Sequence, residues 1–301
     1  MVKLTILGSG AATPTLKRGV TAQYLNFNER RILIDCGEST QLQFRKFGIN
    51  FQRIQYIFIS HLHGDHYLGL PGLLASMHLL GRQNDIHIFA PPELEKILKL
   101  QFDLTFVNLN FEIIYHQLTA KEPTLIFEDN NMMITALPLK HRIPCFGFIF
   151  KEKLKERSII KDLIEPYQLT IPEMVMLKKG HDIEREGKLV SCEKLTIDPP
   201  NPKAYAFCTD TKYIPSLTKA LKEVDVLYHE ATFLESEKAR AKATFHTTAL
   251  QAATLAKTAN VKQLLLGHFS ARYKSTDDHK TEAQTIFHNI LCVEDGDEIL
   301  V

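Results

Sequence analysis

Positions 60 to 66 of the chain read Ser60-His61-Leu62-His63-Gly64-Asp65-His66. This stretch follows the apolar run Ile54–Ile59, a pattern typical of a strand that ends in a ligand loop. Imidazole and carboxylate groups are ligands that zinc prefers. In an extended segment His61 and His63 project to the same side, and the turn at Gly64 lets Asp65 and His66 face a second ion. The spacing predicts a dinuclear metal site, as used to hydrolyse phosphate esters, rather than a polar loop whose histidines merely hydrogen-bond.

The composition is that of a soluble globular protein. The 301 residues allow two ordinary domains or one large α/β domain, with 45% hydrophobic and 24% charged residues. No apolar run is long enough to cross a bilayer, and the N-terminal apolar stretch reaches Gly8 too soon for a signal peptide, so we expect a cytoplasmic protein without a membrane partner. The five cysteines contain no C-x-x-C pair and suit reduced thiols. The net charge of +1 neither supports nor excludes a nucleic acid as partner.

Strand-like and helix-like segments alternate along most of the chain. Two such series are separated by residues 152–182, which are rich in Lys, Glu, Ile and Leu and suggest a projecting insertion in an otherwise single domain, 1–301. We therefore expect an α/β protein with two sheets packed face to face and helices outside. The pattern predicts helices over 68–80, 92–102, 216–224, 249–259 and 277–289, and strands over 3–7, 22–27, 31–35, 55–60, 86–89, 111–116, 132–139, 145–151, 204–209, 226–229, 263–268 and 298–301.

Three further ligand-type residues follow apolar strand-like runs. They are His141 after 132–139, Asp210 after 204–209 and His268 after 264–267. Singly, each is weak evidence, since a histidine after a strand is more often an ordinary surface or core residue. Together with the His61–His66 loop they indicate that partners for two metal ions come from several strand ends.

With these residues the chain resembles the ribonuclease Z family, whose members are tRNA 3′-processing endonucleases of the metallo-β-lactamase superfamily. The resemblance is carried by His61-Leu62-His63-Gly64-Asp65-His66, the following Tyr67-Leu68-Gly69-Leu70-Pro71-Gly72-Leu73-Leu74, Cys208-Thr209-Asp210-Thr211, His229-Glu230-Ala231-Thr232, His246-Thr247 and His268-Phe269-Ser270-Ala271-Arg272-Tyr273. These blocks run in the family's order from about residue 7 to 273.

The resemblance implies a four-layer αββα sandwich of two mixed sheets with a small inserted arm. It implies two Zn²⁺ per subunit: His61, His63 and His141 would hold one, and Asp65, His66 and His268 the other, with Asp210 bridging them. It also implies a homodimer that acts on precursor tRNA, leaving a 3′-hydroxyl on the tRNA and a 5′-phosphate on the trailer. Manganese or iron could replace zinc at such ligands.

Four residues are candidates for the chemistry beside the metals. Asp65 could orient the attacking water or accept its proton, and the family resemblance favours the proton acceptor over a ligand-only role. His246, held by Glu230, would protonate the leaving 3′-oxygen, because a neighbouring carboxylate favours the charged imidazole. The alternative is that Glu230 braces a loop. Arg272 would contact a phosphate with its fork of donors, although an isolated arginine is more often a surface residue.

The N-terminal stretch Leu7-Gly8-Ser9-Gly10-Ala11-Ala12-Thr13-Pro14 invites a dinucleotide-binding interpretation. Thr13 stands at the third glycine position and no helical pattern follows, so that fingerprint fails. We expect a glycine-rich turn near the active site. Thr13-Pro14 and Arg18 resemble the family's N-terminal block, but Gly19 replaces its usual asparagine.

The insertion 152–182 occupies the place of the family's flexible arm, which clasps tRNA away from the cut. Lys178 and Lys179 are candidate phosphate contacts. Nearby glutamates and aspartates offset most of the arm's positive charge, so an ordinary solvated hairpin is the alternative. The family's Gly-Pro motif is absent from Ile171-Pro172-Glu173-Met174-Val175-Met176-Leu177-Lys178-Lys179-Gly180.

Two other functions compete with the tRNA endonuclease. One is another hydrolase of the same fold, such as a small-molecule phosphodiesterase, arylsulfatase, thioesterase or lactonase, which the metal loop alone does not distinguish. The blocks at 229–232 and 268–273 and the inserted arm favour the nuclease. The other is a nucleic-acid-binding scaffold without catalysis, which the presence of all seven ligands argues against.

Overall fold

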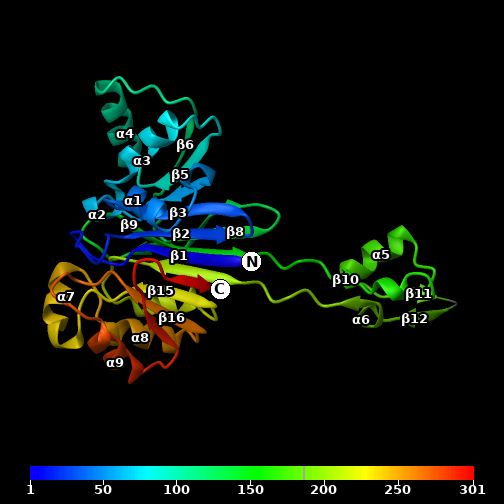
Figure 1. The fold of residues 1–301 in the computed structure, drawn as a ribbon. Coiled ribbons are helices and arrows are strands. Elements are labelled where there is room, and N and C mark those ends of the chain that lie inside the picture. Colours follow the sequence, from blue (N-terminus) through cyan, green and yellow to red (C-terminus); the bar gives the residue numbers. More distant parts are fainter. Residues whose placement is uncertain (186) are drawn as a thin grey trace.

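The computed structural model describes residues 1–185 and 187–301. Two seven-stranded sheets pack face to face, and helices cover the outer face of each sheet (Figure 1). This is the α/β sandwich of two mixed sheets that the sequence predicts. Within the described residues, no helix has both the length and the apolar character that a membrane crossing requires.

The first sheet contains most of the N-terminal strands, in the order β18-β1-β2-β3-β4-β5-β6. The strands β18, β1, β2 and β3 pair antiparallel, and β3 to β6 pair parallel. Their bounds are β1 (Val2–Gly8), β2 (Ala22–Phe27), β3 (Arg30–Cys36), β4 (Tyr56–Phe58), β5 (Ile86–Ala90), β6 (Ile113–Gln117) and β18 (Glu298–Leu300). The helical segments on this side are α1 (Thr40–Lys46), η1 (Phe51–Arg53), α2 (Gly64–Tyr67), α3 (Leu70–Leu79) and α4 (Glu93–Leu104).

The second sheet has the order β17-β16-β15-β14-β9-β8-β7. Its strands are β7 (Thr124–Glu128), β8 (Met132–Leu139), β9 (Cys145–Glu152), β14 (Ala204–Cys208), β15 (Val226–Glu230), β16 (Gln263–Gly267) and β17 (Ile290–Cys292). The helical segments on this side are η3 (Pro215–Lys219), η4 (Glu235–Glu237), α7 (Lys238–Thr244), α8 (Ala249–Thr258) and α9 (Asp277–Gln284). The helix predicted over 277–289 is too long: it ends at Gln284, because residues 290–292 pair in parallel with β16 as the sheet's edge strand.

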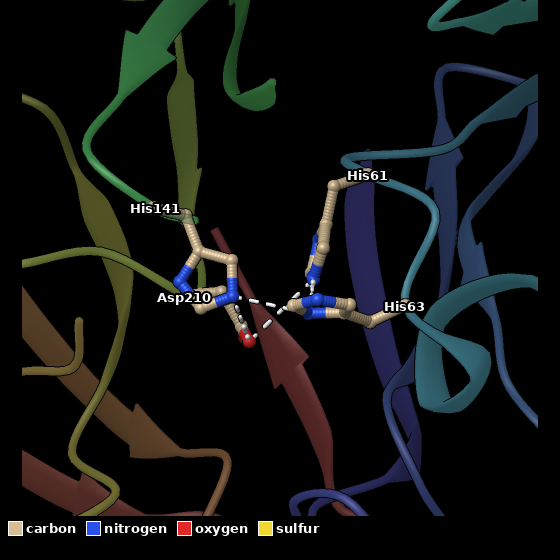
Figure 2. A group of neighbouring side chains, drawn as sticks. All are labelled: His61, His63, His141 and Asp210. Atoms are coloured by element: carbon tan, nitrogen blue, oxygen red, sulfur yellow. Dashed lines mark hydrogen bonds and ion pairs between the residues drawn. The ribbon is translucent and has the colours of Figure 1, made fainter. Parts of the chain in front are cut away.

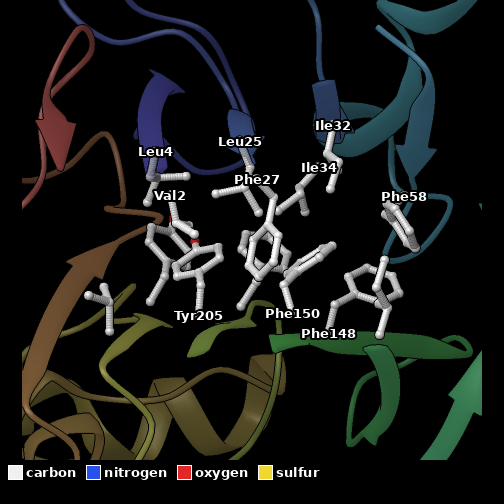
Figure 3. Close-up of a cluster of buried hydrophobic side chains, with 14 of the residues drawn as sticks. Val2, Leu4, Leu25, Phe27, Ile32, Ile34, Phe58, Phe148, Phe150 and Tyr205 are labelled. Carbon is white, nitrogen blue, oxygen red and sulfur yellow. The ribbon is translucent and has the colours of Figure 1, made fainter. Parts of the chain in front are cut away.

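The core between the sheets follows from the two-residue alternation of the strands. In β1, Val2, Leu4 and Ile6 all point into the layer between the sheets, and Figure 3 shows Val2 and Leu4 facing Tyr205 there. Across the same layer the ring of Phe58 meets that of Phe148, with centroids 5.2 Å apart. This apolar layer fixes the two sheets relative to each other, and with them the loops at their common edge.

The strands that precede the candidate ligands end at that common edge. The chain leaves β4 towards His61, β8 towards His141, β14 towards Asp210 and β16 towards His268. In open α/β sheets, ligand sites form outside the carboxyl ends of such strands. Residues distant in sequence are thereby gathered at one place.

The excursion between β9 and β14 projects from the body as a small separate lobe (Figure 1). It contains β10 (Ser158–Ile159), η2 (Lys161–Leu163), α5 (Ile171–Lys178), β11 (Ile183–Arg185), β12 (Lys188–Val190), α6 (Cys192–Leu195) and β13 (Thr196–Ile197). A core of its own includes Leu177, Ile183 and Leu195. The excursion spans 153–203, longer than the predicted 152–182, because 183–203 supply the strands and helix that pack on α5.

Candidate metal centre

The central ligand loop turns into a short helix directly after His63. His63 is extended, with φ −74° and ψ 147°, and α2 begins at Gly64. This change from strand-like to helical backbone places Asp65 and His66 in a different group of ligand atoms from His61 and His63. The local geometry that the spacing predicts is therefore present.

Four side chains form a first group of converging ligand atoms (Figure 2). Nδ1 of His63 lies 3.0 Å from Nε2 of His61 and 3.1 Å from Nε2 of His141. Oδ2 of Asp210 lies 3.6 Å from Nε2 of both His61 and His141. Ligand atoms about 2.0–2.1 Å from one tetrahedral zinc lie roughly 3.3 Å apart, so these separations suit a single ion.

A second group forms on the other side of Asp210. Oδ1 of Asp210 lies 3.3 Å from Nε2 of His66 and 3.0 Å from Nε2 of His268. Oδ2 of Asp65 lies 3.4 Å and 3.5 Å from the same two nitrogens. Asp210 thus turns one oxygen to each group, as a bridging carboxylate would.

The chemistry of these donors fits divalent cations. Among the residues that the structure describes, Nε2 of His66 and Nε2 of His268 are buried without a hydrogen bond, although carboxylate oxygens are close. Burial lowers the pKa of His61 well below its ordinary value, which leaves its lone pair free to bind a metal. Burial disfavours a charged His66, but Asp210, Asp65 and Asp35 outweigh this and raise its pKa well above the ordinary value. Such an excess of negative charge suits bound cations.

The second ring nitrogen of His66 is held by a residue that the sequence argument missed. Oδ2 of Asp35 lies 2.7 Å from Nδ1 of His66, and Asp35 also accepts hydrogen bonds from the backbone N–H and hydroxyl of Ser60 at 2.7 and 2.8 Å. A carboxylate on the far nitrogen fixes the tautomer and orientation of a metal-binding imidazole. Asp35 occupies a strand end as the ligands do, and that signal could have identified it.

Two other histidines are oriented in the same way. Nδ1 of His141 lies 3.1 Å from the carbonyl oxygen of Phe245, and Nδ1 of His268 lies 2.9 Å from Oγ1 of Thr232. In both cases Nε2 is left to face the ligand groups. The Thr232 contact gives a physical reason for the threonine in the His229–Thr232 block.

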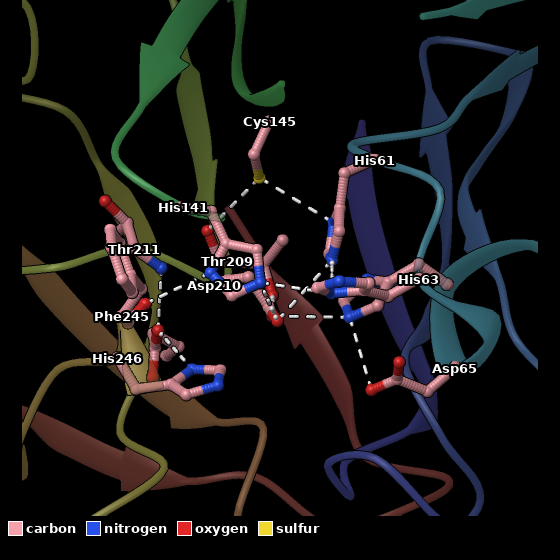
Figure 4. A network of polar contacts seen from close by, with 12 residues as sticks. His61, His63, Asp65, His141, Cys145, Thr209, Asp210, Thr211, Phe245 and His246 are labelled. Atoms are coloured by element: carbon pink, nitrogen blue, oxygen red, sulfur yellow. Dashed lines mark hydrogen bonds and ion pairs between the residues drawn. The ribbon is translucent and has the colours of Figure 1, made fainter. Parts of the chain in front are cut away.

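The buried Glu230 and the partly exposed His246 form an ion pair beside the ligands, as Figure 4 shows for His246 and its surroundings. Oε1 of Glu230 lies 2.9 Å from Nδ1 of His246 and accepts a 2.7 Å bond from the backbone N–H of Thr211. Oε2 accepts a 2.6 Å bond from the hydroxyl of Thr232. Burial disfavours a charged His246, but the Glu230 carboxylate outweighs it and raises the pKa of His246 to about 9.

A cavity of about 390 Å³ opens over the two ligand groups. Arg272 lines this cavity. Its Nη1 lies 3.1 Å from Oε2 of Glu237, and its guanidinium carbon lies 5.1 Å from the ring centre of Phe233. Two arginines that the sequence argument did not single out, Arg142 and Arg240, line the same cavity.

The glycine-rich N-terminal turn reaches the site, as predicted. Ala11, Ala12 and Thr13 line the cavity, and the backbone N–H of Ala12 donates a 2.7 Å hydrogen bond to Oδ2 of Asp65. Burial opposes ionisation of Asp65, but His66 and His268 outweigh it and hold the pKa of the carboxyl far below its usual range. Asp65 is therefore ionised at neutral pH.

Lys178 and Lys179 lie apart from this cluster. Both are exposed at the end of α5 in the projecting lobe. They line a shallow surface depression with Arg157 and Asp198, far along the chain from the ligand loops. The structure thus gathers the other site residues around one cavity and leaves these two lysines outside it.

The chain is 42% identical to ribonuclease Z of Bacteroides fragilis over 295 residues, which is 98% of this chain and 97% of that protein. The structure is similar to human tRNase Z, short form, with a TM-score of 0.73, 28% identity, and 99% and 98% of the two chains covered. It also shares the fold of YhfI from Bacillus subtilis, described as a metallo-beta-lactamase fold protein, with a TM-score of 0.69, 18% identity, and 99% and 98% covered.

A family model described as "Anti-Pycsar protein Apyc1" matches residues 2–160. The matched part contains His61, His63, Asp65, His66 and His141 but ends before Asp210 and His268. The similarity to the ribonuclease Z of Bacteroides fragilis, in contrast, extends over nearly the whole chain.

Proposed function

The chain belongs to the ribonuclease Z family, and from that premise we propose that it is a metal-dependent endoribonuclease that removes 3′ trailers from tRNA precursors. Its products are a 3′-hydroxyl on the tRNA and a 5′-phosphate on the trailer. The observation that carries the proposal is the convergence of seven ligand-type side chains beside the Glu230–His246 pair, with five of the seven and His246 lining one open cavity.

The two ligand groups would hold two divalent ions, which we propose to be Zn²⁺. His61, His63 and His141 would bind one ion, Asp65, His66 and His268 the other, and Asp210 both. His and Asp donors of this kind suit zinc. Bound there, the ions would supply a nucleophile at neutral pH and relieve charge at the phosphate.

Asp65 would accept the proton of the attacking water. Its carboxyl is ionised at neutral pH, since His66 and His268 outweigh the effect of burial on its pKa. The N–H of Ala12 holds Oδ2 in place at 2.7 Å. A fixed, ionised carboxylate that lines the cavity can receive a proton without reorganising.

His246 would protonate the leaving 3′-oxygen. With a pKa raised to about 9 it carries a proton at neutral pH. Nδ1 faces Glu230, so Nε2 is the nitrogen that can donate into the cavity. Arg272 lines the same cavity and would contact a phosphate with its guanidinium. To do so it would leave its ion pair with the partly exposed Glu237.

The projecting lobe would hold the RNA away from the cut. Lys178 and Lys179 are exposed, and phosphate contacts of this kind position RNA without reading its sequence. The resemblance implies a homodimer, which light scattering of the purified protein tests. The five cysteines are free, which suits the reducing cytoplasm that we propose for the protein.

A second candidate function is the hydrolysis of small phosphodiesters. It stays a candidate because the central ligand loop, which lies within the residues 2–160 matched by the Apyc1 model, suits the hydrolysis of a phosphodiester of any size. The nearly full-length similarity to ribonuclease Z, including the Glu230 and His246 region, favours the RNA substrate.

The first test is incubation of the purified protein with a 3′-extended precursor tRNA, beside an Asp65→Ala variant and a chelator-treated sample. We expect a single cut near the acceptor end, lost in both controls. An intact precursor combined with hydrolysis of bis(p-nitrophenyl) phosphate would reject the tRNA substrate and support the second candidate.

A further inference from the structure

Two arginines at the cavity have no role in the mechanism above. Arg142 and Arg240 line it together with Arg272, and both are exposed. Arg272 is paired with Glu237, whereas no ion pair involving Arg142 or Arg240 occurs within residues 1–185 and 187–301. The cavity therefore has two guanidinium groups that are free to take an anionic partner.

Both arginines lie on the side of the cavity that contains His246, which we call the His246 wall. Arg142 directly follows His141, whose ring centre lies 5.3 Å from that of His246. Arg240 is on α7, and the backbone N–H of His246 donates a 2.8 Å bond to the carbonyl of Ala241, the next residue. Thr244, at the end of α7, lines the cavity as well.

The N-terminal turn forms a different part of the cavity. There the backbone of Ala12 donates to Asp65, the candidate acceptor of the water proton. In an in-line displacement the attacking and leaving oxygens lie on opposite sides of phosphorus. The side of the cavity next to His246 is thus the side of the leaving group.

We propose that Arg142 and Arg240 bind the RNA phosphates immediately 5′ of the cut, on the part of the substrate that becomes mature tRNA. The inference rests on the proposed function, in which His246 protonates the 3′-oxygen of that part. The phosphates next to this oxygen in the 5′ direction must then lie along the His246 wall. The planar fork of arginine suits phosphate oxygens, and a chain of net charge +1 needs local cations to attract RNA.

The test pairs protein variants with substrates that carry a neutral linkage. Arg240→Gln and Arg142→Gln are measured on a precursor with normal phosphates and on precursors with one methylphosphonate, placed at the first or second phosphate 5′ of the cut, or at the first phosphate 3′ of it. We expect each variant to lose roughly tenfold in kcat/KM on the normal precursor. The slope of log(kcat/KM) against log salt should fall by about 0.7.

The decisive readout is coupling. One of the 5′ methylphosphonates should abolish the additional loss caused by each variant, and the 3′ methylphosphonate should leave it unchanged. Additive losses at both 5′ positions, or coupling at the 3′ position, would overturn the inference.

Lys242→Gln is the matched control. Lys242 is exposed on the same helix, two residues from Arg240 and therefore on another face, and it does not line the cavity. It should keep the wild-type salt slope. Arg240→Lys, which restores the charge, should recover part of the loss, and melting temperature and metal content report on folding. If the wild type does not cleave the precursor, the proposed function fails; if it cleaves and no coupling appears, only this inference fails.

Discussion

The residues that contact the candidate ligands and His246 determine how these side chains are oriented and whether they carry a proton. His66 presents Nε2 to the cluster because Asp35 holds Nδ1, and His246 keeps its proton because Glu230 faces it. Both carboxylates are fully buried. Buried charges of this kind are costly unless paired, so each is tied to its imidazole and to nearby hydrogen-bond donors.

Replacing Glu230 with glutamine should shift the pH dependence of catalysis. As the proposed general acid, His246 would act while protonated, so activity should be present below its pKa and lost as pH rises through it. With Glu230 that pKa is about 9; without the carboxylate, burial is opposed mainly by the weaker effect of Asp210, so the pKa should fall. We expect the alkaline limb of kcat to move from near pH 9 to lower pH. An unchanged limb in Glu230→Gln would contradict the role of His246 as general acid.

Replacing Asp35 with asparagine should weaken metal binding although every ligand is retained. Removing the carboxylate behind a metal-binding histidine typically costs 10–100-fold in affinity. Competition with a chelator measures the loss. Asp225→Asn is the control. Asp225 is a buried carboxylate just before β15, at the end of that strand away from Glu230, and it accepts hydrogen bonds from the N–H of Ala204 and the ammonium of Lys262. Equal affinities of the two variants would show that Asp35 is only structural.

At the scale of elements, the position of α2 depends on close backbone contact. Gly69, between α2 and α3, packs against the turn after β3: a Cβ there would lie 2.2 Å from the carbonyl oxygen of Gly37. This contact holds the helix of Asp65 and His66 against the sheet. This close packing explains why the first residue of the Gly-Leu-Pro-Gly-Leu-Leu segment is a glycine.

The two glycines of that segment should respond to alanine in opposite ways. Gly69→Ala must displace backbone and should destabilise the protein by about 2 kcal/mol or more, with loss of metal affinity. At Gly72, inside α3, a Cβ meets nothing within 4 Å, so alanine should stabilise by about 0.4–1 kcal/mol. Urea unfolding of both variants measures the difference. A neutral Gly69→Ala variant would show that α2 is not held by this contact.

At the scale of the whole molecule, the body and the lobe have separate cores. The lobe buries Leu177, Ile183 and Leu195 among its own elements. The two ends of the excursion lie side by side, because the N–H of Glu152 donates to the carbonyl of Lys203 at 2.8 Å. The lobe therefore adds little to the stability of the body.

Replacing residues 155–201 with a short Gly-Ser turn should leave the body folded. Its melting temperature should change by only a few degrees, because no part of the two-sheet core is removed. The KM for precursor tRNA should rise, since Lys178 and Lys179 are removed with the lobe. Scanning calorimetry and RNA cleavage measure the two effects. An unchanged KM would separate the lobe from substrate binding.

The sequence by itself determined the ligand loop and the architecture. The spacing of His61, His63, Asp65 and His66 is local, so two backbone conformations in succession suffice to direct them to two groups. The alternation of strands and helices likewise predicted the two-sheet sandwich, because periodicity is a property of each segment alone. The end of α9 at Gln284, and the strands β17 and β7 that the pattern did not predict, depended on pairing with a neighbouring strand.

Only the tertiary structure decided which distant residues meet. Asp35 reaches His66 across 31 positions and Thr232 reaches His268 across 36, and neither contact leaves a periodic signal in the sequence. The same holds for Arg142 and Arg240, which share a wall only because β8 and α7 end at one edge of the sandwich. Such contacts follow from the packing of two sheets on a common apolar layer, which brings together strand ends that are far apart along the chain.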